Sequence, residues 1–145
     1  MPAEICSFVR RTSVMTEVAC AIIMRGEEVL ITQRSETMPH PLCWEFPGGK
    51  LKPGESPEKC IVREIREELH ATISVDRLLP TVIHSYGDQV IKLIPFICKL
   101  KTGTPELQQH KAYKWIRRED VVNFRILEAD LKIIDRMNGA WNASF

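Results

Sequence analysis

Three glutamates in one short segment carry the clearest chemical signal in this sequence. Glu64, Glu67 and Glu68 stand at positions i, i+3 and i+4, so on a helix their side chains share one face at about 5–6 Å between Cβ atoms. Like charges that close repel one another unless a cation joins them. Carboxylate oxygens suit a hard divalent ion, and Mg²⁺ or Mn²⁺ typically keeps positions for water and substrate phosphates. The spacing therefore predicts metal-assisted attack on a phosphate chain.

The segment around these acids is expected to be a helix from about residue 57 to 70. Ser56 offers an N-cap oxygen and Pro57 suits the first helical position. Apolar side chains recur every four residues and form a stripe to be buried, at Ile61, Ile65 and Leu69. A helix resting on a sheet through this stripe would hold the acids at the edge of a cleft.

The other elements are mostly expected to be strands. Residues 16–24 and 29–34 are predicted to form a hairpin across Gly26, and residues 35–56, with four prolines and three glycines, to form an ordered loop. Strand composition recurs in residues 72–75, 78–86, 90–100 and 112–116, with a helix at 127–137. Pro95 favours an edge strand or a bulge in its run. The mixture indicates a layered α+β or α/β domain.

Length and composition limit the classes of function. The 145 residues fit one domain, 1–145, in which residues 1–15 are an additional arm or strand. A net charge of +1 gives no general attraction to a nucleic acid polymer or a membrane. Five cysteines with no C-x-x-C pair favour a reducing compartment, so a cytoplasmic location is expected. The sequence leaves a monomer and a homodimer open.

A longer pattern resembles a known family. Gly49, Glu55 and the run Arg63-Glu64-Ile65-Arg66-Glu67-Glu68 match the Nudix box of Nudix hydrolases, Gly-x5-Glu-x7-Arg-Glu-apolar-x-Glu-Glu-x-Gly-apolar. The flanking WEFPGGK at residues 44–50 resembles the MutT-like and CTP pyrophosphohydrolase branch. The resemblance implies the α/β class, with a Nudix-type α/β/α sandwich that holds a mixed β-sheet between helices.

The resemblance also implies roles for the acidic cluster. Glu64 and Glu68 would bind the metal together with the Gly48 carbonyl, and Glu67 would either bind it or act as base for the attacking water. The alternative to metal binding is that these acids form an ordinary solvated face of the helix. Arg63 would hold the catalytic cluster in shape as a fork to Glu55 or a neighbouring acid; the alternative is an ordinary surface pair with Glu67, worth a few tenths of a kcal/mol.

Substrate contacts follow from the same resemblance. Arg34 is the first phosphate candidate and Lys50 the second, although either could be a surface cation. Asp130 falls where relatives place a base-reading Asn or Asp; otherwise it is a helix N-terminal acid favoured by the dipole. Phe46 could flank a base or belong to the core, and His40 lies in the loop that faces the expected pocket.

Two positions depart from the family pattern. His70 replaces the closing glycine of the box, where a helix end favours a positive φ angle. Gln109 precedes His110 where many relatives of this branch carry a glutamate, so it cannot act as an anionic ligand or base. We expect altered geometry at the first position and retained metal binding.

The function that follows is Mg²⁺-dependent hydrolysis, with Mn²⁺ as a possible substitute. The substrate is a nucleoside triphosphate, modified or pyrimidine, such as oxidised dGTP or a CTP-type nucleotide, and the products are the monophosphate and pyrophosphate. The alternatives are a nucleotide-sugar or dinucleoside polyphosphate hydrolase, and a non-catalytic Nudix-fold nucleotide sensor. His70 and Gln109 favour the sensor, whereas the four retained box glutamates favour the enzyme.

Overall fold

The computed structural model describes residues 15–137 and residue 141. The prediction of an additional arm or strand in residues 1–15 lies outside that part of the chain, except for Met15, which begins β1. The elements in chain order are β1 (Met15–Arg25), β2 (Glu28–Gln33), β3 (Trp44–Glu45), β4 (Gly48–Lys50), α2 (Pro57–Leu69), β5 (Thr72–Leu78), β6 (Val82–Tyr86), β7 (Gln89–Thr102), β8 (Ala112–Ile116), the 3₁₀ helix η1 (Arg118–Asn123) and α3 (Glu128–Met137).

Within the described residues, the strands form one eight-stranded mixed sheet. Its main path runs β3-β2-β1-β7-β5, with β4 paired to β1, β6 to β7 and β8 to β2. The long central strands β1 and β7 are parallel, and the other pairs are antiparallel. The predicted β1–β2 hairpin is confirmed, since Arg25 pairs with Glu28 and Gly26 adopts a positive φ of 61° in the turn.

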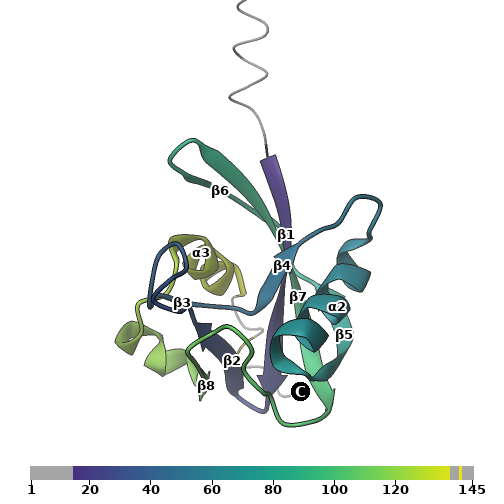
Figure 1. Cartoon of the computed structure of the whole chain (residues 1–145). Coiled ribbons are helices and arrows are strands. Elements are labelled where there is room, and N and C mark those ends of the chain that lie inside the picture. Colours follow the sequence, from purple (N-terminus) through teal and green to yellow (C-terminus); the bar gives the residue numbers. More distant parts are fainter. Residues whose placement is uncertain (1–14, 138–140, 142–145) are drawn as a thin grey trace, which may run out of the picture.

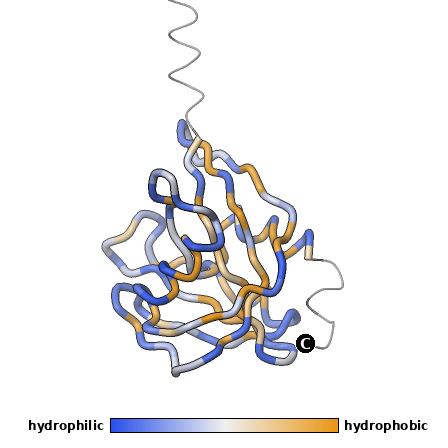
Figure 2. Tube along the Cα trace, turned by 90° about the vertical axis from the view of Figure 1, so that its right-hand side faces the viewer, coloured by the Kyte–Doolittle hydropathy of each residue, from blue (hydrophilic) through white to orange (hydrophobic). Residues whose placement is uncertain are grey.

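Alternating side chains build two cores, one on each face of the sheet. Along β1, Cys20, Ile22 and Met24 belong to one buried cluster, whereas the residues between them belong to the other. The period of two follows from the pleat, which points successive side chains to opposite faces. Helix α3 covers the first cluster and α2 the second, so the sheet lies between the helices as predicted (Figure 1). Figure 2 shows hydrophobic stretches along neighbouring strands and hydrophilic outer loops.

Of the two alternatives for the strand with Pro95, the edge position is wrong, whereas a register shift does interrupt its pairing with β5, between Val75 and Arg77. Strand β7 lies inside the sheet, between β1 on one side and β5 and β6 on the other. The proline is tolerated because its carbonyl accepts the Leu79 N–H (2.8 Å), in the short link between β5 and β6. A residue's N–H and C=O point to the same side of a strand, so the missing N–H faces the gap where β7 changes partners and no ladder bond is lost.

Two other predicted boundaries differ from the structure. The run at 78–86 is interrupted at residues 79–81, between β5 and β6. The loop at 35–56 is ordered but contains two short strands, β3 and β4. Each forms because a neighbouring strand, β2 for β3 and β1 for β4, offers it free backbone groups. The composition of such short segments does not reveal this pairing.

An opening between strands prepares the site. Strand β1 pairs with β2 only at Met24 and Arg25, whereas nearer its start β1 pairs with β4 through Val18, Ala19 and Cys20. The sheet therefore splits around β4, and the segment from β3 to α2 crosses the split. Among the described residues, no helix is long and apolar enough to cross a membrane.

Candidate functional site

A cavity of about 560 Å³ lies at the split in the sheet. The predicted acids of α2 line it together with the glycine turn, at Gly48, Glu64, Glu67 and Glu68. The predicted substrate residues line it too, at Arg34, His40, Phe46, Lys50 and Asp130. Glu55 and Arg63 do not line this cavity. The structure thus brings most of the predicted site residues around one hollow and places these two behind it.

Helix α2 forms as the sequence predicts. Ser56 is the N-cap, its hydroxyl accepts the Lys59 N–H (3.3 Å), and Pro57 begins the helix. The apolar stripe is fully buried against the sheet, with Cys60 beside it. The helix is capped at His70, whose φ of 49° is the left-handed conformation that glycine would adopt there, so the altered backbone geometry expected at this position is not seen. The buried stripe therefore fixes the rotation of the helix and turns Glu64 and Glu68 toward β4.

The two glycines of β4 let the chain pass close to the acids. A Cβ on Gly49 would fall within the carboxyl group of Glu64, and a Cβ on Gly48 would collide with the backbone of Ala19 in β1. The bare backbone is therefore needed for the approach of strand, helix and carboxylate. Cys60 stabilises the turn, since its Sγ donates to the carbonyl oxygens of Gly49 and Lys50, each at 3.6 Å.

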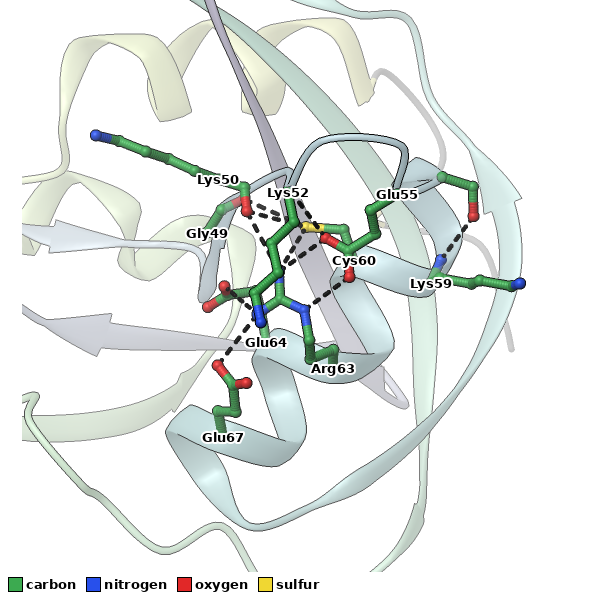
Figure 3. A network of polar contacts seen from close by, with 10 residues as sticks. Gly49, Lys50, Lys52, Glu55, Lys59, Cys60, Arg63, Glu64 and Glu67 are labelled. Carbon is green, nitrogen blue, oxygen red and sulfur yellow. Dashed lines mark hydrogen bonds and ion pairs between the residues drawn. The ribbon is translucent and has the colours of Figure 1, made fainter.

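Arg63 joins three of the box glutamates (Figure 3). Its Nε donates to Glu55 Oε2 (2.7 Å) and its Nη2 to Glu55 Oε1 (2.8 Å), a two-bond fork. Its Nη1 donates to Glu64 (2.8 Å) and Glu67 (3.1 Å). The hydrogen bond with Arg63 lowers the pKa of Glu55 from 4.5 to about 2. The predicted fork is present, and it orients Glu64 from behind the cavity.

Among the described residues, Glu68 has no basic side chain as an ion-pair partner. Its pKa is raised from 4.5 to about 9, first by burial and then by the charges of Glu64 and Glu45, although the Gly48 N–H bonds to it. Its Oε2 is buried, and no described residue forms a hydrogen bond to it. An orphaned carboxylate oxygen beside a second carboxylate is costly to bury unless a cation accompanies it.

The residues present fit a divalent cation. Within residues 15–137 and 141, no three side chains of His, Cys, Asp or Glu converge as a preformed cage, because Arg63 holds Glu67 on the exposed side. Glu64 and Glu68 offer two carboxylates, and the nearby Gly48 offers a backbone carbonyl. Such an all-oxygen set suits Mg²⁺, which uses few protein ligands and keeps positions for water and phosphate.

Sequence reasoning missed Glu45, the second anionic centre of the cavity. Arg34 Nη1 lies 2.9 and 3.1 Å from its two carboxylate oxygens, and His110 Nε2 lies 2.9 Å from Oε2. Arg34 Nε also donates to the Pro39 carbonyl (2.6 Å). Arg34 reaches the cavity as predicted, but a carboxylate already occupies its guanidinium. Glu45 is the acid of the motif WEFPGGK, so the sequence contained a signal for this residue. The interpretation considered only the glutamates of the box pattern.

Asp130 and Phe46 form the buried end of the cavity. Asp130 is only 4% exposed, and its carboxylate accepts the Phe46 N–H. Burial raises its pKa, and the charge of Glu45 raises it further, against a smaller lowering by Arg34. Phe46 is 4% exposed and packs in the core while one side faces the cavity. The core alternative for Phe46 is confirmed, and its contact with a base stays a prediction.

The other predicted residues lie at the rim. Lys50 is exposed, and His40 is exposed in the loop between β2 and β3 with a positive φ of 52°. Gln109 lines the cavity next to His110. Tyr86 is a second lining residue that sequence reasoning missed, because nothing in its strand distinguishes a wall residue from an ordinary β-forming one.

Comparison with known proteins assigns most of the chain to one domain family. The NUDIX domain model matches residues 15–137. The chain is 31% identical over 121 residues to a CTP pyrophosphohydrolase of Escherichia coli, covering 83% of this chain and 90% of the relative. It is 31% identical over 96 residues to the 8-oxo-dGTP diphosphatase of Escherichia coli, covering 65% and 74%.

Solved structures of related sequence share the fold of this chain. The ORF135 protein of Escherichia coli superposes with a TM-score of 0.75 at 30% identity, covering 89% of this chain and 91% of that one. The MutT protein of Methanosarcina mazei superposes with a TM-score of 0.75 at 25% identity, covering 86% and 95%.

Proposed function

The chain belongs to the NUDIX family and is a MutT-like Nudix hydrolase, and from that premise we propose its reaction. It hydrolyses a nucleoside triphosphate to the monophosphate and pyrophosphate with Mg²⁺, and Mn²⁺ can substitute. The observation that carries the proposal is the buried, unpartnered Oε2 of Glu68, held beside Glu64 in a cavity that also contains Arg34 and Asp130.

The acidic side of the cavity supplies the chemistry. Glu64, Glu68 and the Gly48 carbonyl would hold the divalent cation. Bound there, the cation neutralises charge that develops on phosphate oxygens during an in-line displacement. Arg63 fixes Glu64 through the contact of 2.8 Å, and Glu55 fixes Arg63 through its two-bond fork.

Glu67 is the proposed proton acceptor. Its side chain is 55% exposed and one oxygen contacts Arg63 at 3.1 Å, so the carboxylate lies at the open side of the cluster where water enters. Glu68, by contrast, has a buried carboxylate oxygen where it lines the cavity. This difference in exposure supports the assignment of Glu67 as base and Glu68 as ligand.

Two cations that line the cavity, Arg34 and Lys50, would bind the phosphate chain. Arg34 must exchange its bonds to Glu45 for phosphate oxygens, and a guanidinium suits both partners because each offers paired acceptors. Lys50 is exposed at the rim and can approach the phosphates without breaking a described ion pair.

Asp130 would read the base. A carboxylate accepts hydrogen bonds from amino and imino groups, which cytosine-type and oxidised guanine bases both present. The names of the two relatives, a CTP pyrophosphohydrolase and an 8-oxo-dGTP diphosphatase, support a substrate of one of these kinds. We therefore propose a modified or pyrimidine nucleoside triphosphate.

A substrate panel tests the proposal. Canonical, methylated and oxidised nucleoside triphosphates are incubated with the protein and Mg²⁺, and pyrophosphate release is measured. We expect turnover of at least one pyrimidine or oxidised purine nucleotide, with Asp130→Ala losing preference among bases more than it loses total activity. Nucleotide binding without turnover across the panel would instead establish the sensor function that Gln109 favours.

A further inference from the structure

Tyr86 is an aromatic wall of the cavity to which the proposed chemistry gives no task. It ends β6, is half-buried, and lines the same cavity as Asp130 and the α2 acids. No part of metal binding or phosphate contact needs an aromatic ring there. Its surroundings nevertheless fix this ring more firmly than packing alone would.

Two contacts fix the orientation of the Tyr86 side chain. Its hydroxyl accepts the N–H of Ala129 in the first turn of α3 (3.0 Å). The edge of its ring meets His84 with centroids 4.5 Å apart and planes at 63°. His84 is 9% exposed, and its Nε2 lies 3.3 Å from the Glu128 carboxylate. The ring is therefore anchored at its hydroxyl and supported from the sheet, so little conformational entropy remains to be lost on binding.

The anchor places the ring beside the base-reading acid. Ala129, which donates to the tyrosine, is the residue directly before Asp130. Asp130 is held in turn by the Phe46 N–H. Helix α3 thus sets both the aromatic face and the buried carboxylate through two consecutive residues, an arrangement suited to a flat ring whose edge carries hydrogen-bond donors.

His40 covers the exposed part of Tyr86. Its ring lies with its centroid 4.9 Å from that of Tyr86, at a tilt of 52°. The residue is exposed and has a φ of 52°, a backbone conformation that is costly for a residue other than glycine. The backbone of the loop is held, since the His40 carbonyl accepts the Cys43 N–H (3.3 Å). The exposed side chain of His40 is not enclosed by packing, so an incoming ring can displace it without moving the loop.

We propose that Tyr86 is the platform on which the substrate's nucleobase stacks, and that His40 occupies this platform until the base displaces it. The proposal rests on the proposed function and names its substrate class: polyphosphates that carry a flat heterocycle, in preference to inorganic phosphate chains. Tyr86 and Asp130 would divide recognition between them, since the ring contacts the face of the base and the carboxylate reads its edge.

Substitution of Tyr86 gives the first test. Base–aromatic stacking is worth enough for its loss to reduce affinity on the order of 10-fold or more. We expect Tyr86→Leu to lower kcat/KM at least about 10-fold for the best nucleotide of the panel, mainly through KM, while hydrolysis or competitive binding of inorganic tripolyphosphate changes less than twofold. Tyr86→Phe keeps the ring, so its KM for the nucleotide should stay near the wild-type value.

The chain offers a matched control. Tyr113, the other tyrosine, lies on β8 and packs against the opposite core cluster, away from the cavity. Tyr113→Leu should leave the KM ratio of nucleotide to tripolyphosphate unchanged. His40→Ala uncovers the platform and should lower the nucleotide KM. Circular dichroism and thermal melts confirm that each variant is folded before it is assayed.

The results separate this inference from the function on which it rests. If the wild type turns over no nucleotide, the proposed function fails. If it is active but Tyr86→Leu weakens nucleotide and tripolyphosphate equally, the platform is overturned while the reaction stands. An increased nucleotide KM in His40→Ala would overturn the displacement of His40.

Discussion

Glu68 combines burial, a like-charged neighbour and an unpartnered oxygen, and each of these has a cost in the metal-free protein. Substitution by the permanently neutral glutamine should therefore have opposite effects on activity and stability. We expect Glu68→Gln to lower kcat by about 10²- to 10⁴-fold while the metal-free protein melts at the same or a higher temperature. Pyrophosphate release and differential scanning calorimetry in EDTA provide the two measurements.

Glu58→Gln on the same helix is the control, because Glu58 is exposed in the first turn and away from the cavity. Its kcat should stay within about twofold of the wild type. A Glu68→Gln variant with wild-type kcat would remove Glu68 from the catalytic machinery.

The Glu55–Arg63 fork predicts a pH dependence of stability. Because the pKa of Glu55 is lowered from 4.5 to about 2 by its hydrogen bond with Arg63, its stabilising effect is fully present above pH 4.5 and is lost as the pH falls through 2. In EDTA, the wild type should melt at a higher temperature than Glu55→Gln at pH 6, and the two should converge as the pH approaches 2. A difference that stays constant down to pH 2 would contradict the fork.

At this scale the sequence revealed the box residues because their types and spacing are specific. It did not reveal Glu45, Tyr86 or the occupation of Arg34. These depend on contacts between strands that are distant in the chain: His110 approaches Glu45 across 65 positions, and Ala129 approaches Tyr86 across 43. No local pattern encodes which side chain will face another across a cavity.

Among the elements, α2 was predictable in detail because its cap, proline and apolar stripe agree. Its C-terminus shows a local conflict, since His70 adopts the left-handed conformation that glycine adopts without strain. We expect His70→Gly to raise the melting temperature by about 1–4 °C, from a gain of about 0.5–1 kcal/mol. Thermal melts of the two proteins under the same conditions provide the measurement. The contact of His70 with Glu106 (3.4 Å) joins two exposed side chains, so its loss should count little.

His70→Ala serves as the comparison. Alanine keeps the strained φ and removes the contact with Glu106, so its melting temperature should not exceed that of the wild type. A glycine variant less stable than the alanine variant would show that the histidine side chain, rather than the backbone, determines stability at this position.

Strand β7 shows why element prediction was incomplete. Pro95 was expected at an edge or a bulge because it lacks an N–H. The structure satisfies the same constraint by changing the partner strand opposite the proline. The sequence correctly indicated that Pro95 needs a position where no ladder hydrogen bond is lost. The order of strands that provides this position depends on how the whole sheet assembles.

The whole molecule depends on two cores that meet at the sheet, and Trp141 closes one of them. It is fully buried, and its Nε1 donates to the Glu27 carbonyl in the β1–β2 turn (2.9 Å). We expect Trp141→Ala to reduce the free energy of unfolding by about 3–5 kcal/mol and Trp141→Phe by less, as measured by urea denaturation. Because the residue lies outside the cavity, kcat should stay near the wild-type value well below the melting temperature.

The layered architecture followed from the alternation of strands and amphipathic helices together with the resemblance to the Nudix box. The split of the sheet around β4, which creates the cavity, did not. It arises because β1 is long enough to pair with β2 at one end and β4 at the other, and that division of partners is decided by packing of the whole sheet.

The central claim is that the α2 acids hold a divalent cation for cleavage of a nucleoside triphosphate. Phosphorus NMR of the products, with the most active nucleotide of the panel, tests it directly. We predict monophosphate and pyrophosphate with wild-type protein and Mg²⁺, no cleavage with EDTA, and cleavage slowed at least about 100-fold with Glu68→Gln. Diphosphate and inorganic phosphate as products, or undiminished cleavage in EDTA, would contradict it.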